Sequence, residues 1–223
     1  INECEIQTHN CSSNAFCNNT KGSYICTCKP GYIGNGVNCT EFMNSSILNS
    51  SDYYFGHLGN FLETAVGDNS HWLLCWRATL HGWSASQFHS RCDGKNDTVT
   101  IIRNGKSIFG GYTDIPWESS GGWSVTSEAF IFSLNNNEGV APFVTKMKKE
   151  YSGGAINRSS GYGPYFAYHI FIADNADSNR KSRALISVHY SVPPAVNRWS
   201  TVLAGTEHFS PDEVEVFYLD PSR

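Results

Sequence analysis

The chain has 223 residues, which is enough for one sizeable hydrophobic core and one small additional domain. Its 16 basic and 20 acidic residues give a net charge of −4, so no excess of charge directs it to nucleic acid or to an anionic membrane surface. No apolar run approaches the ~20 residues that a membrane-spanning helix needs. We therefore expect no nucleic-acid partner and no transmembrane segment in this chain.

Cysteine usage is uneven along the chain. Six of the eight cysteines lie within the first 39 residues, which predicts a small disulfide-held domain followed by a larger one built on a core. Such density indicates an oxidising compartment, and the start at Ile1 without methionine indicates a processed or cropped piece of a longer protein. Six cysteines allow 15 pairings, so spacing alone fixes none of them. A zinc site is the alternative, but it needs reduced thiolates, and no histidine lies at ligand spacing. The six residues are Cys4, Cys11, Cys17, Cys26, Cys28 and Cys39.

The spacing of these cysteines, together with Gly22-Ser23-Tyr24 and Lys29-Pro30-Gly31-Tyr32, resembles an EGF-like module over residues 1–40. The resemblance implies the disulfides Cys4–Cys17, Cys11–Cys26 and Cys28–Cys39.

Asn2-Glu3-Cys4 and Asn19 resemble the calcium-binding subtype of this module, so calcium is the expected cofactor. Calcium takes six to eight oxygen ligands. The resemblance implies a carboxylate oxygen from Glu3, an amide oxygen from Asn19 and main-chain carbonyls. The implied ligand set is Ile1, Asn2, Glu3, Asn19, Thr20 and Ser23. The same stretch resembles the family's asparagine-hydroxylation pattern, with Asn19 as the modified residue. The acidic residue that the family has just before Ile1 lies outside this chain, and a module without metal is the alternative.

Residues 41–51 are rich in asparagine and serine and predict a linker between the two domains. Asn-x-Ser/Thr triplets, the acceptor pattern for N-linked glycans, support secretion. We expect glycans on some of Asn18, Asn44, Asn49, Asn96 and Asn157. Asn10 and Asn38 begin two further triplets, but a cysteine fills the middle position of each.

The larger domain, expected over residues 52–223, begins with a predicted helix from Asp52 to Ala65. Its apolar stripe is Tyr54, Leu58, Phe61, Leu62 and Ala65. Residues 72–77 have the length of a buried strand. A second helix follows Trp83, because Ser84 and Gln87 have the spacing of a capping box and Gly94 provides the stop.

An Asn104-Gly105 turn predicts a β-hairpin between strands 98–103 and 107–109, because both residues tolerate positive φ. The following pair, Gly110-Gly111, indicates a bulge or a close backbone approach.

Further strands are expected at 129–134, 143–147, 169–173, 185–188 and 214–219, and turns at Gly161–Pro164. Short strands without alternating helices indicate an antiparallel sandwich.

Several ordered motifs of this region resemble the TLDc domain of oxidation-resistance proteins, over roughly Phe42 to Asp220. The motifs are Leu74–Arg77, His81-Gly82, Ser84–Phe88, Ile108–Tyr112, Glu128–Leu134 and Glu213–Val216. The resemblance implies a mainly-β, two-sheet sandwich with short helices at its edge. The better-known members are cytosolic and bind the proton-pumping vacuolar ATPase.

We find no specific catalytic motif, neither a GxSxG elbow nor an HExxH helix, and the histidines are scattered, so we expect no enzyme. The oxygen-rich stretch Asp174–Asn179 is expected to bond its own backbone, with a second calcium or sugar site as the alternative. Cys75 and Cys92 are expected to form a disulfide, with two buried thiols as the alternative.

The expected function is recognition, adhesion or structural assembly by a secreted, glycosylated, modular extracellular protein. Its partner would be an extracellular protein, a glycan or a second copy of the chain. One alternative is a lectin-like carbohydrate binder, because the chain is rich in tryptophan and tyrosine. Another is oxidative-stress protection or an enzymatic role, by analogy with the cytosolic relatives. Free thiols at Cys75 and Cys92 would favour that role, and a disulfide between them would argue against it.

Overall fold

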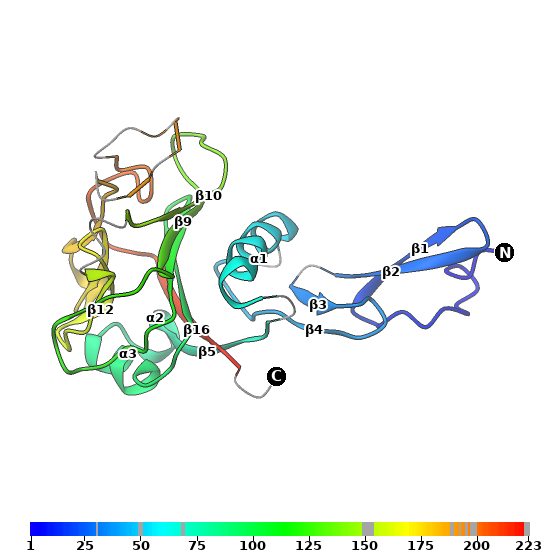
Figure 1. Cartoon of the computed structure of the whole chain (residues 1–223), viewed down its shortest axis with the longest axis horizontal. Helices are drawn as coiled ribbons and strands as arrows, with labels where there is room; N and C mark the ends of the chain where they lie inside the picture. The colour runs from blue at the N-terminus through cyan, green and yellow to red at the C-terminus, as the bar shows by residue number, and fades with distance from the viewer. Residues whose placement is uncertain are drawn as a thin grey trace. The chain divides into compact units, whose positions relative to one another are not determined.

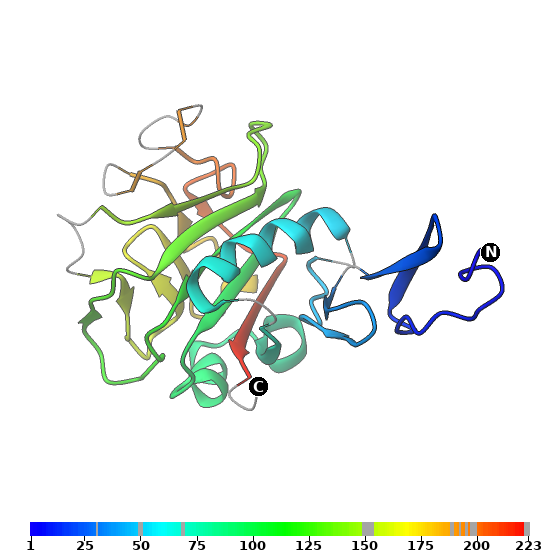
Figure 2. The same ribbon diagram turned by 45° about the vertical axis from the view of Figure 1, so that its right-hand side comes forward.

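The computed structural model of the chain describes residues 1–29, 31–48, 51–67, 70–148, 154–187, 190–191, 193–194, 196 and 200–220. These residues form two compact units, which Figures 1 and 2 colour by position in the chain. The first unit runs from Ile1 to Leu73 and includes Asp220. The second runs from Leu74 to Leu219.

The first unit begins with two antiparallel hairpins (Figure 1, blue), formed by β1 (Ala15–Thr20), β2 (Ser23–Cys28), β3 (Tyr32–Gly34) and β4 (Cys39–Glu41). Among the residues up to the end of β4 whose burial the structure describes, Gly36 alone is buried, so apolar burial contributes little to these hairpins. Three disulfides hold them instead: Cys4–Cys17, Cys11–Cys26 and Cys28–Cys39. This is the pairing that the EGF resemblance implies.

Helix α1 (Asp52–Val66) is the helix predicted from the apolar stripe. The stripe was only partly right, because the buried side chains are Phe55, Leu58 and Leu62. The ring of Phe55 lies edge-on to Phe42, with 6.3 Å between centroids. The segment before the helix, expected as a linker, buries four of its apolar side chains, so it packs rather than runs free: Phe42, Met43, Ile47 and Leu48.

The second unit is a sandwich of two six-stranded antiparallel sheets, which confirms the predicted fold class. The first sheet has the order β10-β9-β7-β6-β16-β5 and the second has the order β15-β14-β13-β12-β11-β8. Figure 2 shows strands of the first sheet, in green, in front of strands of the second, in yellow. Strand β5 begins at the end of the first unit.

The strands of the first sheet are β5 (Trp72–Arg77), β6 (Thr98–Asn104), β7 (Ser107–Thr113), β9 (Phe130–Asn135), β10 (Phe143–Lys146) and β16 (Glu213–Leu219). Those of the second are β8 (Trp123–Ser124), β11 (Ile156–Asn157), β12 (Tyr162–Phe166), β13 (Ile170–Ala173), β14 (Ser182–Ala184) and β15 (His208–Phe209). The short helices are α2 (Ala78–His81), α3 (Ala85–Cys92) and η2 (Ala176–Ser178), a 3-10 helix.

The two sheets meet at a glycine. A Cβ atom added to Gly111 of β7 would lie 2.9 Å from the ring of Phe166 on β12. That ring lies edge-on to Trp117 at 5.5 Å, and Trp117 in turn contacts Phe88 of α3 at 5.5 Å. The predicted close approach at the glycine pair is therefore confirmed: Gly111 leaves room for a large ring between the sheets.

Helix α3 begins as its sequence predicts. Ser84 Oγ accepts from Gln87 N at 3.3 Å, and Gln87 Oε1 accepts from Ser84 N at 3.3 Å, which completes the capping box. The disulfide Cys75–Cys92 joins β5 to the end of this helix. Both cysteines are buried.

Two glutamates of the motif Glu213–Val216 make buried contacts that hold β16 to the start of the domain. Glu215 is fully buried on β16, and its Oε1 accepts from Arg77 Nε at 2.7 Å. Glu213 accepts from the main-chain N of Thr79, at the start of α2, at 3.1 Å. The pair fastens the β5–α2 corner to the last strand, so these carboxylates serve structure and are not available to a substrate.

The structure corrects two local predictions. Residues Tyr162–Phe166 form strand β12 rather than turns. Pro164 falls where the register with β13 shifts, and irregular positions of this kind tolerate a proline in a strand. The strand expected at 185–188 lies earlier, as β14, and Ile186 makes one isolated bridge to Ser200. Val188 lies outside the described residues.

Candidate functional site

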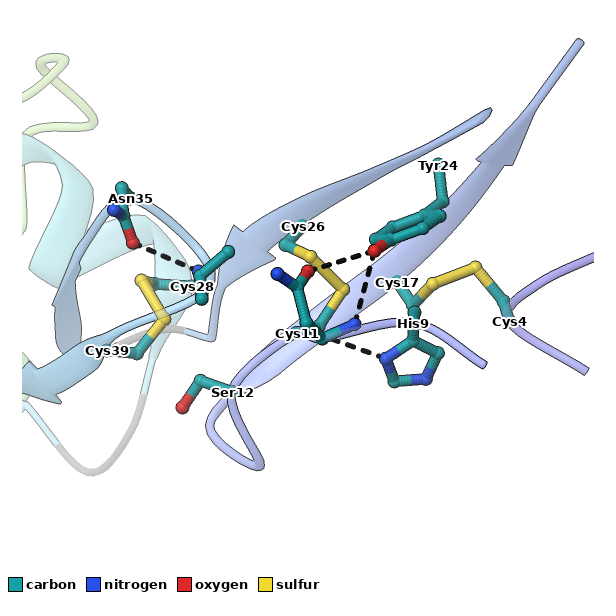
Figure 3. The surroundings of a disulfide bond; sticks show 12 residues. Cys4, His9, Cys11, Ser12, Cys17, Tyr24, Cys26, Cys28, Asn35 and Cys39 are labelled. Atoms are coloured by element: carbon teal, nitrogen blue, oxygen red, sulfur yellow. Dashed lines mark hydrogen bonds between the residues drawn. A yellow bond between two sulfur atoms is a disulfide. The ribbon is translucent and has the colours of Figure 1, made fainter. Parts of the chain in front are cut away.

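The N-terminal turn of the EGF-like module is held against the first hairpin by a covalent bond. Ile6 N donates to Asn2 O at 3.2 Å, and Thr8 N donates to Glu3 O at 3.1 Å, which folds the segment into a turn. The Cys4–Cys17 disulfide joins this turn to β1 (Figure 3). The residue next to Glu3 is therefore fixed to the hairpin.

The same hairpin carries the other implied calcium ligands. Asn19 lies two residues after Cys17, so both side chains share one face of β1. Thr20 pairs with Ser23 across the two-residue turn at the end of the hairpin. The disulfide thus brings the N-terminal turn to the strand face on which Asn19 lies.

Glu3 has the property expected of a cation ligand. Its Oε2 atom is buried and has no hydrogen-bond partner. A buried carboxylate oxygen without a partner is costly, and a calcium ion would satisfy it. Asn2 fits less well, because Oδ1 accepts from Glu5 N at 3.3 Å and its carbonyl accepts from Ile6 N. The implied set of Ile1, Asn2, Glu3, Asn19, Thr20 and Ser23 stays a prediction, and Glu3 is the member whose surroundings favour it. Asn19 is exposed, and its hydroxylation stays a prediction.

A second group of potential ligands in the module is not a metal site. His9 lies with Cys11 and Cys17 so that their ligand atoms are all within 4.8 Å of one another. Both sulfurs are in disulfides, which removes the thiolates that zinc requires. His9 Nδ1 instead accepts from Cys11 N at 3.2 Å (Figure 3), so the ring supports the turn before that cysteine.

The glycan acceptors differ in their surroundings. Asn18, Asn44 and Asn96 are exposed, Asn157 is half-buried on β11, and Asn49 lies outside the described residues. Tyr24 Oη donates to Asn10 Oδ1 at 2.9 Å and accepts from Asn10 N at 3.3 Å (Figure 3). Asn10 therefore has a structural use in holding Tyr24.

Two buried histidines of the sandwich have the neighbours of catalytic residues but not the accessibility. His89 Nδ1 lies 2.7 Å from Asp93 Oδ1, and its Nε2 faces the carbonyls of Ser159 and Tyr162 at 3.2 and 3.0 Å. Main-chain oxygens thus occupy the position next to Nε2 that a catalytic nucleophile would need. The contacts of His89 instead join α3 to the segment at the start of β12.

His169 and Ser187 are the other such pair. Ser187 Oγ lies 3.4 Å from His169 Nε2, but Ser187 is only 3% exposed and His169 only 2% exposed. His169 Nδ1 lies 2.8 Å from the carbonyl of Leu185, so a main-chain group takes the place of an orienting carboxylate. Burial of both residues therefore keeps this hydroxyl from solvent.

The oxygen-rich stretch Asp174–Asn179 bonds its own backbone, as its sequence suggests. Asn179 Nδ2 donates to the carbonyls of Asp174 and Asn175 at 3.0 and 2.7 Å. Asp174 Oδ1 accepts from Ala85 N at 2.8 Å, at the first turn of α3. The stretch therefore positions α3, and its oxygens are mostly in use.

A cluster of rings on the outer side of the second sheet was not found from the sequence. Tyr165 pairs with Phe171 across β12 and β13, while their neighbours Phe166 and Ile170 point into the core. The rings of this cluster, called here the aromatic face, are Trp123, Tyr162, Tyr165, Tyr168 and Phe171. Burial among them raises the pKa of Tyr165 to about 12. Tyr162 and Tyr168 are 38% and 57% exposed, so the face meets solvent.

Comparison with known proteins identifies both parts of the chain. A family model described as an EGF domain matches residues 4–39, and one described as a TLDc domain matches residues 42–220. Across the part of the chain that the structure describes, no helix is both long and apolar enough to cross a membrane.

Several extracellular proteins are similar to part of the chain. Rat "Sushi, von Willebrand factor type A, EGF and pentraxin domain-containing protein 1" is 54% identical over 41 residues, which are 18% of this chain and 1% of that protein. The Caenorhabditis elegans "Transmembrane cell adhesion receptor mua-3" is 54% identical over 42 residues, again 18% and 1%. Human "Cartilage oligomeric matrix protein" is 53% identical over 120 residues, which are 48% of this chain and 16% of that protein. The chain thus spans a small part of the relatives it matches.

Proposed function

We propose that this chain, which belongs to the TLDc-domain family and carries an EGF domain ahead of that domain, is a recognition and assembly part of a secreted, modular extracellular protein. The observation that carries the proposal is the pairing of all eight cysteines in four disulfides. Disulfides of this density persist in oxidising compartments and are rare in the cytosol. The relatives with EGF domains bear the names of matrix and adhesion proteins, which supports the same location.

The oxidation state in native source material tests this location. Alkylation of the unfolded but unreduced protein should label no cysteine, because each thiol is consumed in a disulfide. Full labelling of the six cysteines of the EGF module would contradict secretion through an oxidising pathway. Labelling confined to Cys75 and Cys92 would leave secretion intact and remove only the fourth disulfide.

Calcium bound at the N-terminal end of the EGF module is the second part of the proposal. Its role would be to order the N-terminal turn on the hairpin, using the otherwise unpaired carboxylate of Glu3. Extracellular modules bind calcium with dissociation constants of about 10⁻⁴–10⁻³ M. Such affinities match a structural ion that stays bound where calcium is abundant, rather than a signalling sensor.

Calorimetric calcium titration of two isosteric variants tests the assignment. Glu3→Gln should weaken binding at least tenfold, because it removes the charge of an implied ligand. Glu5→Gln is the matched control, since Glu5 is exposed on the same turn, and should leave affinity unchanged. Equal effects of the two variants would mean that general charge, and not a site at Glu3, governs binding.

The two alternative functions, a redox or enzymatic role and a lectin-like role, differ in their structural support. Cys75 and Cys92 form a disulfide, and both are buried, so thiol redox chemistry of the kind suggested by analogy with cytosolic relatives has no reactive group there. The lectin-like alternative is favoured by one observation, the solvent-facing aromatic face on the second sheet.

A further inference from the structure

The aromatic face surrounds one of the predicted glycan acceptors. Asn157 on β11 lies directly opposite Trp123 on β8. Ile156, the neighbour of Asn157 on β11, is fully buried in the core between the sheets, so the Asn157 side chain points to the outer side. Directly opposed residues in an antiparallel pair have Cβ atoms about 4.5–5.5 Å apart. The side chains of Asn157 and Trp123 therefore start from neighbouring positions on the outer side of the sheet.

The second neighbour of Asn157 is also aromatic. Ile156 pairs with Phe166 on β12, which puts the adjoining residue, Tyr165, beside Asn157 on the outer side. The Trp123 ring lies 4.3 Å from the ring of Tyr168, which is the most exposed ring of the aromatic face. The acceptor asparagine thus lies between rings on both flanking strands.

The orientation of the Asn157 amide suits glycan attachment. Its Oδ1 accepts a hydrogen bond from Ser159 N at 2.9 Å, which turns Oδ1 toward the main chain. No hydrogen bond from Nδ2 to another described residue is present, and the side chain is half-exposed. In the triplet Asn157-Arg158-Ser159, Nδ2 is the atom that accepts the sugar.

Backbone strain in the neighbouring turn serves to present a ring. Ala167 and Tyr168, between β12 and β13, have φ of 45° and 59°. Glycine or asparagine adopts this left-handed region at lower cost than other residues. Here the turn instead carries a tyrosine, whose ring lies beside Trp123.

We propose that the aromatic face is the docking surface of an N-linked glycan on Asn157, with the first N-acetylglucosamine against Trp123 and Tyr168. The apolar C–H face of the sugar covers ring surface that would otherwise meet water. The inference rests on the proposed function, since glycan transfer occurs in the secretory pathway. In that transfer, Nδ2 forms a bond to C1 of a lipid-pyrophosphate-linked oligosaccharide. The bond from C1 to the pyrophosphate oxygen breaks, and Nδ2 loses one proton.

The test uses the full chain secreted from a glycosylating cell line. Peptide mass spectrometry should find Asn157 occupied. Asn157→Gln should lower the melting temperature of the sandwich by about 2–4 °C, as loss of roughly 1 kcal/mol does in a domain of this size. Asn96→Gln is the matched control, because Asn96 is exposed and lies outside the aromatic face. Loss of the Asn96 glycan should leave the melting temperature of the sandwich unchanged.

A double-mutant cycle separates docking from a general effect of glycosylation. Tyr168→Asn removes the exposed ring, and asparagine suits the positive φ at this position, so the variant should fold. In the Tyr168→Asn background the stabilisation by the Asn157 glycan should fall by at least half. In the native sequence, the N-acetyl methyl protons of the Asn157-linked sugar should also be shifted upfield by the indole ring, and those on Asn96 should not.

Three results would overturn the inference while leaving secretion intact. The first is glycans on Asn44 and Asn96 with none on Asn157. The second is a stabilisation by the Asn157 glycan that is the same in the Tyr168→Asn background, and the third is self-association of glycosylated chains through this face. Absence of glycan from every acceptor in native material would contradict the proposed secretion itself.

Discussion

The two ends of the chain reach stability by opposite routes. In the EGF module no large side chain is buried among the residues up to Glu41 whose burial the structure describes, and Phe16 and Ile25 are 50% and 58% exposed. In the sandwich, rings such as Phe166 and Trp117 are almost fully buried between two sheets. A small module has too little interior to offset its conformational entropy, so covalent bonds restrict its unfolded chain, whereas the sandwich relies on apolar burial.

The largest expected effect is in the sandwich core. Phe166→Ala should destabilise the second unit by about 3–5 kcal/mol, because it removes the ring that fills the space above Gly111. Denaturant unfolding followed by tryptophan fluorescence measures the loss. Phe171→Ala on the neighbouring strand is the control and should cost less, because that ring lies on the outer, partly exposed side. Equal losses would mean that the inter-sheet contact is not the centre of the core.

The complementary change removes one disulfide bond from the EGF module. Replacing Cys11 and Cys26 together by serine should destabilise the module by about 2–5 kcal/mol, chiefly by freeing its unfolded chain. Amide exchange should show lost protection in β1 and β2 while the strands of the sandwich keep theirs. Retained protection in both hairpins would show that the module has a source of stability other than its disulfides.

Two glycine-to-alanine substitutions test how tightly each region is packed around the glycine. Gly111→Ala should cost about 1–3 kcal/mol, because the new methyl group would meet the Phe166 ring. Gly56→Ala in α1 should instead stabilise the chain by about 1 kcal/mol, since nothing lies within 4 Å of the added Cβ and alanine favours helix. Thermal unfolding of both variants checks the sign, and a stabilising Gly111→Ala would contradict the close approach of the sheets.

The smallest effect concerns pH. Burial, with smaller contributions from Arg91 and Arg77, lowers the pKa of His81 below its usual value. Its Nδ1 accepts from Arg77 N at 3.0 Å, which also requires that nitrogen to be unprotonated. The unfolded chain therefore binds this proton first, with a pKa of about 6.5. Stability should fall as pH drops through that value toward the lower native pKa.

His81→Asn keeps an acceptor near Arg77 N and removes the titrating group. Unfolding free energies of the native sequence and this variant, measured from pH 7.5 to 5, should diverge only below about pH 6.5. Parallel curves over that whole range would show that His81 does not contribute to the acid sensitivity of the sandwich.

Local chemistry explains what the sequence could predict. The Ser84–Gln87 capping box and the cysteine spacing of the module are each determined within a few residues, and the structure contains both. The predicted hairpin also forms, but its turn is shifted by one residue: Asn104 ends β6 and pairs with Ser107, so the turn residues are Gly105 and Lys106. Strand β12 was missed because its Gly163-Pro164 pair has the composition of a turn, and only pairing with β13 makes it extended.

The aromatic face was missed for a related reason. Its rings come from β8, from β12 and β13, and from the turn between those two strands, and they share a face only because of the register of that sheet. No local pattern connects Trp123 with Tyr168. The unpaired oxygen of Glu3 is similar, because the resemblance implied a ligand there but only the folded turn shows that the atom has no other partner.

The most direct test of the account is a calcium titration of the chain followed by NMR, with both regions observed at once. The account predicts that amide signals of the N-terminal turn and of residues around Asn19 move with calcium and that signals of β6, β7 and β12 stay in place. In Glu3→Gln the same movement should require calcium concentrations at least tenfold higher. Movement of the sandwich signals to the same extent as those of the module, or an unchanged titration in Glu3→Gln, would contradict a calcium-ordered module beside an independently stable sandwich.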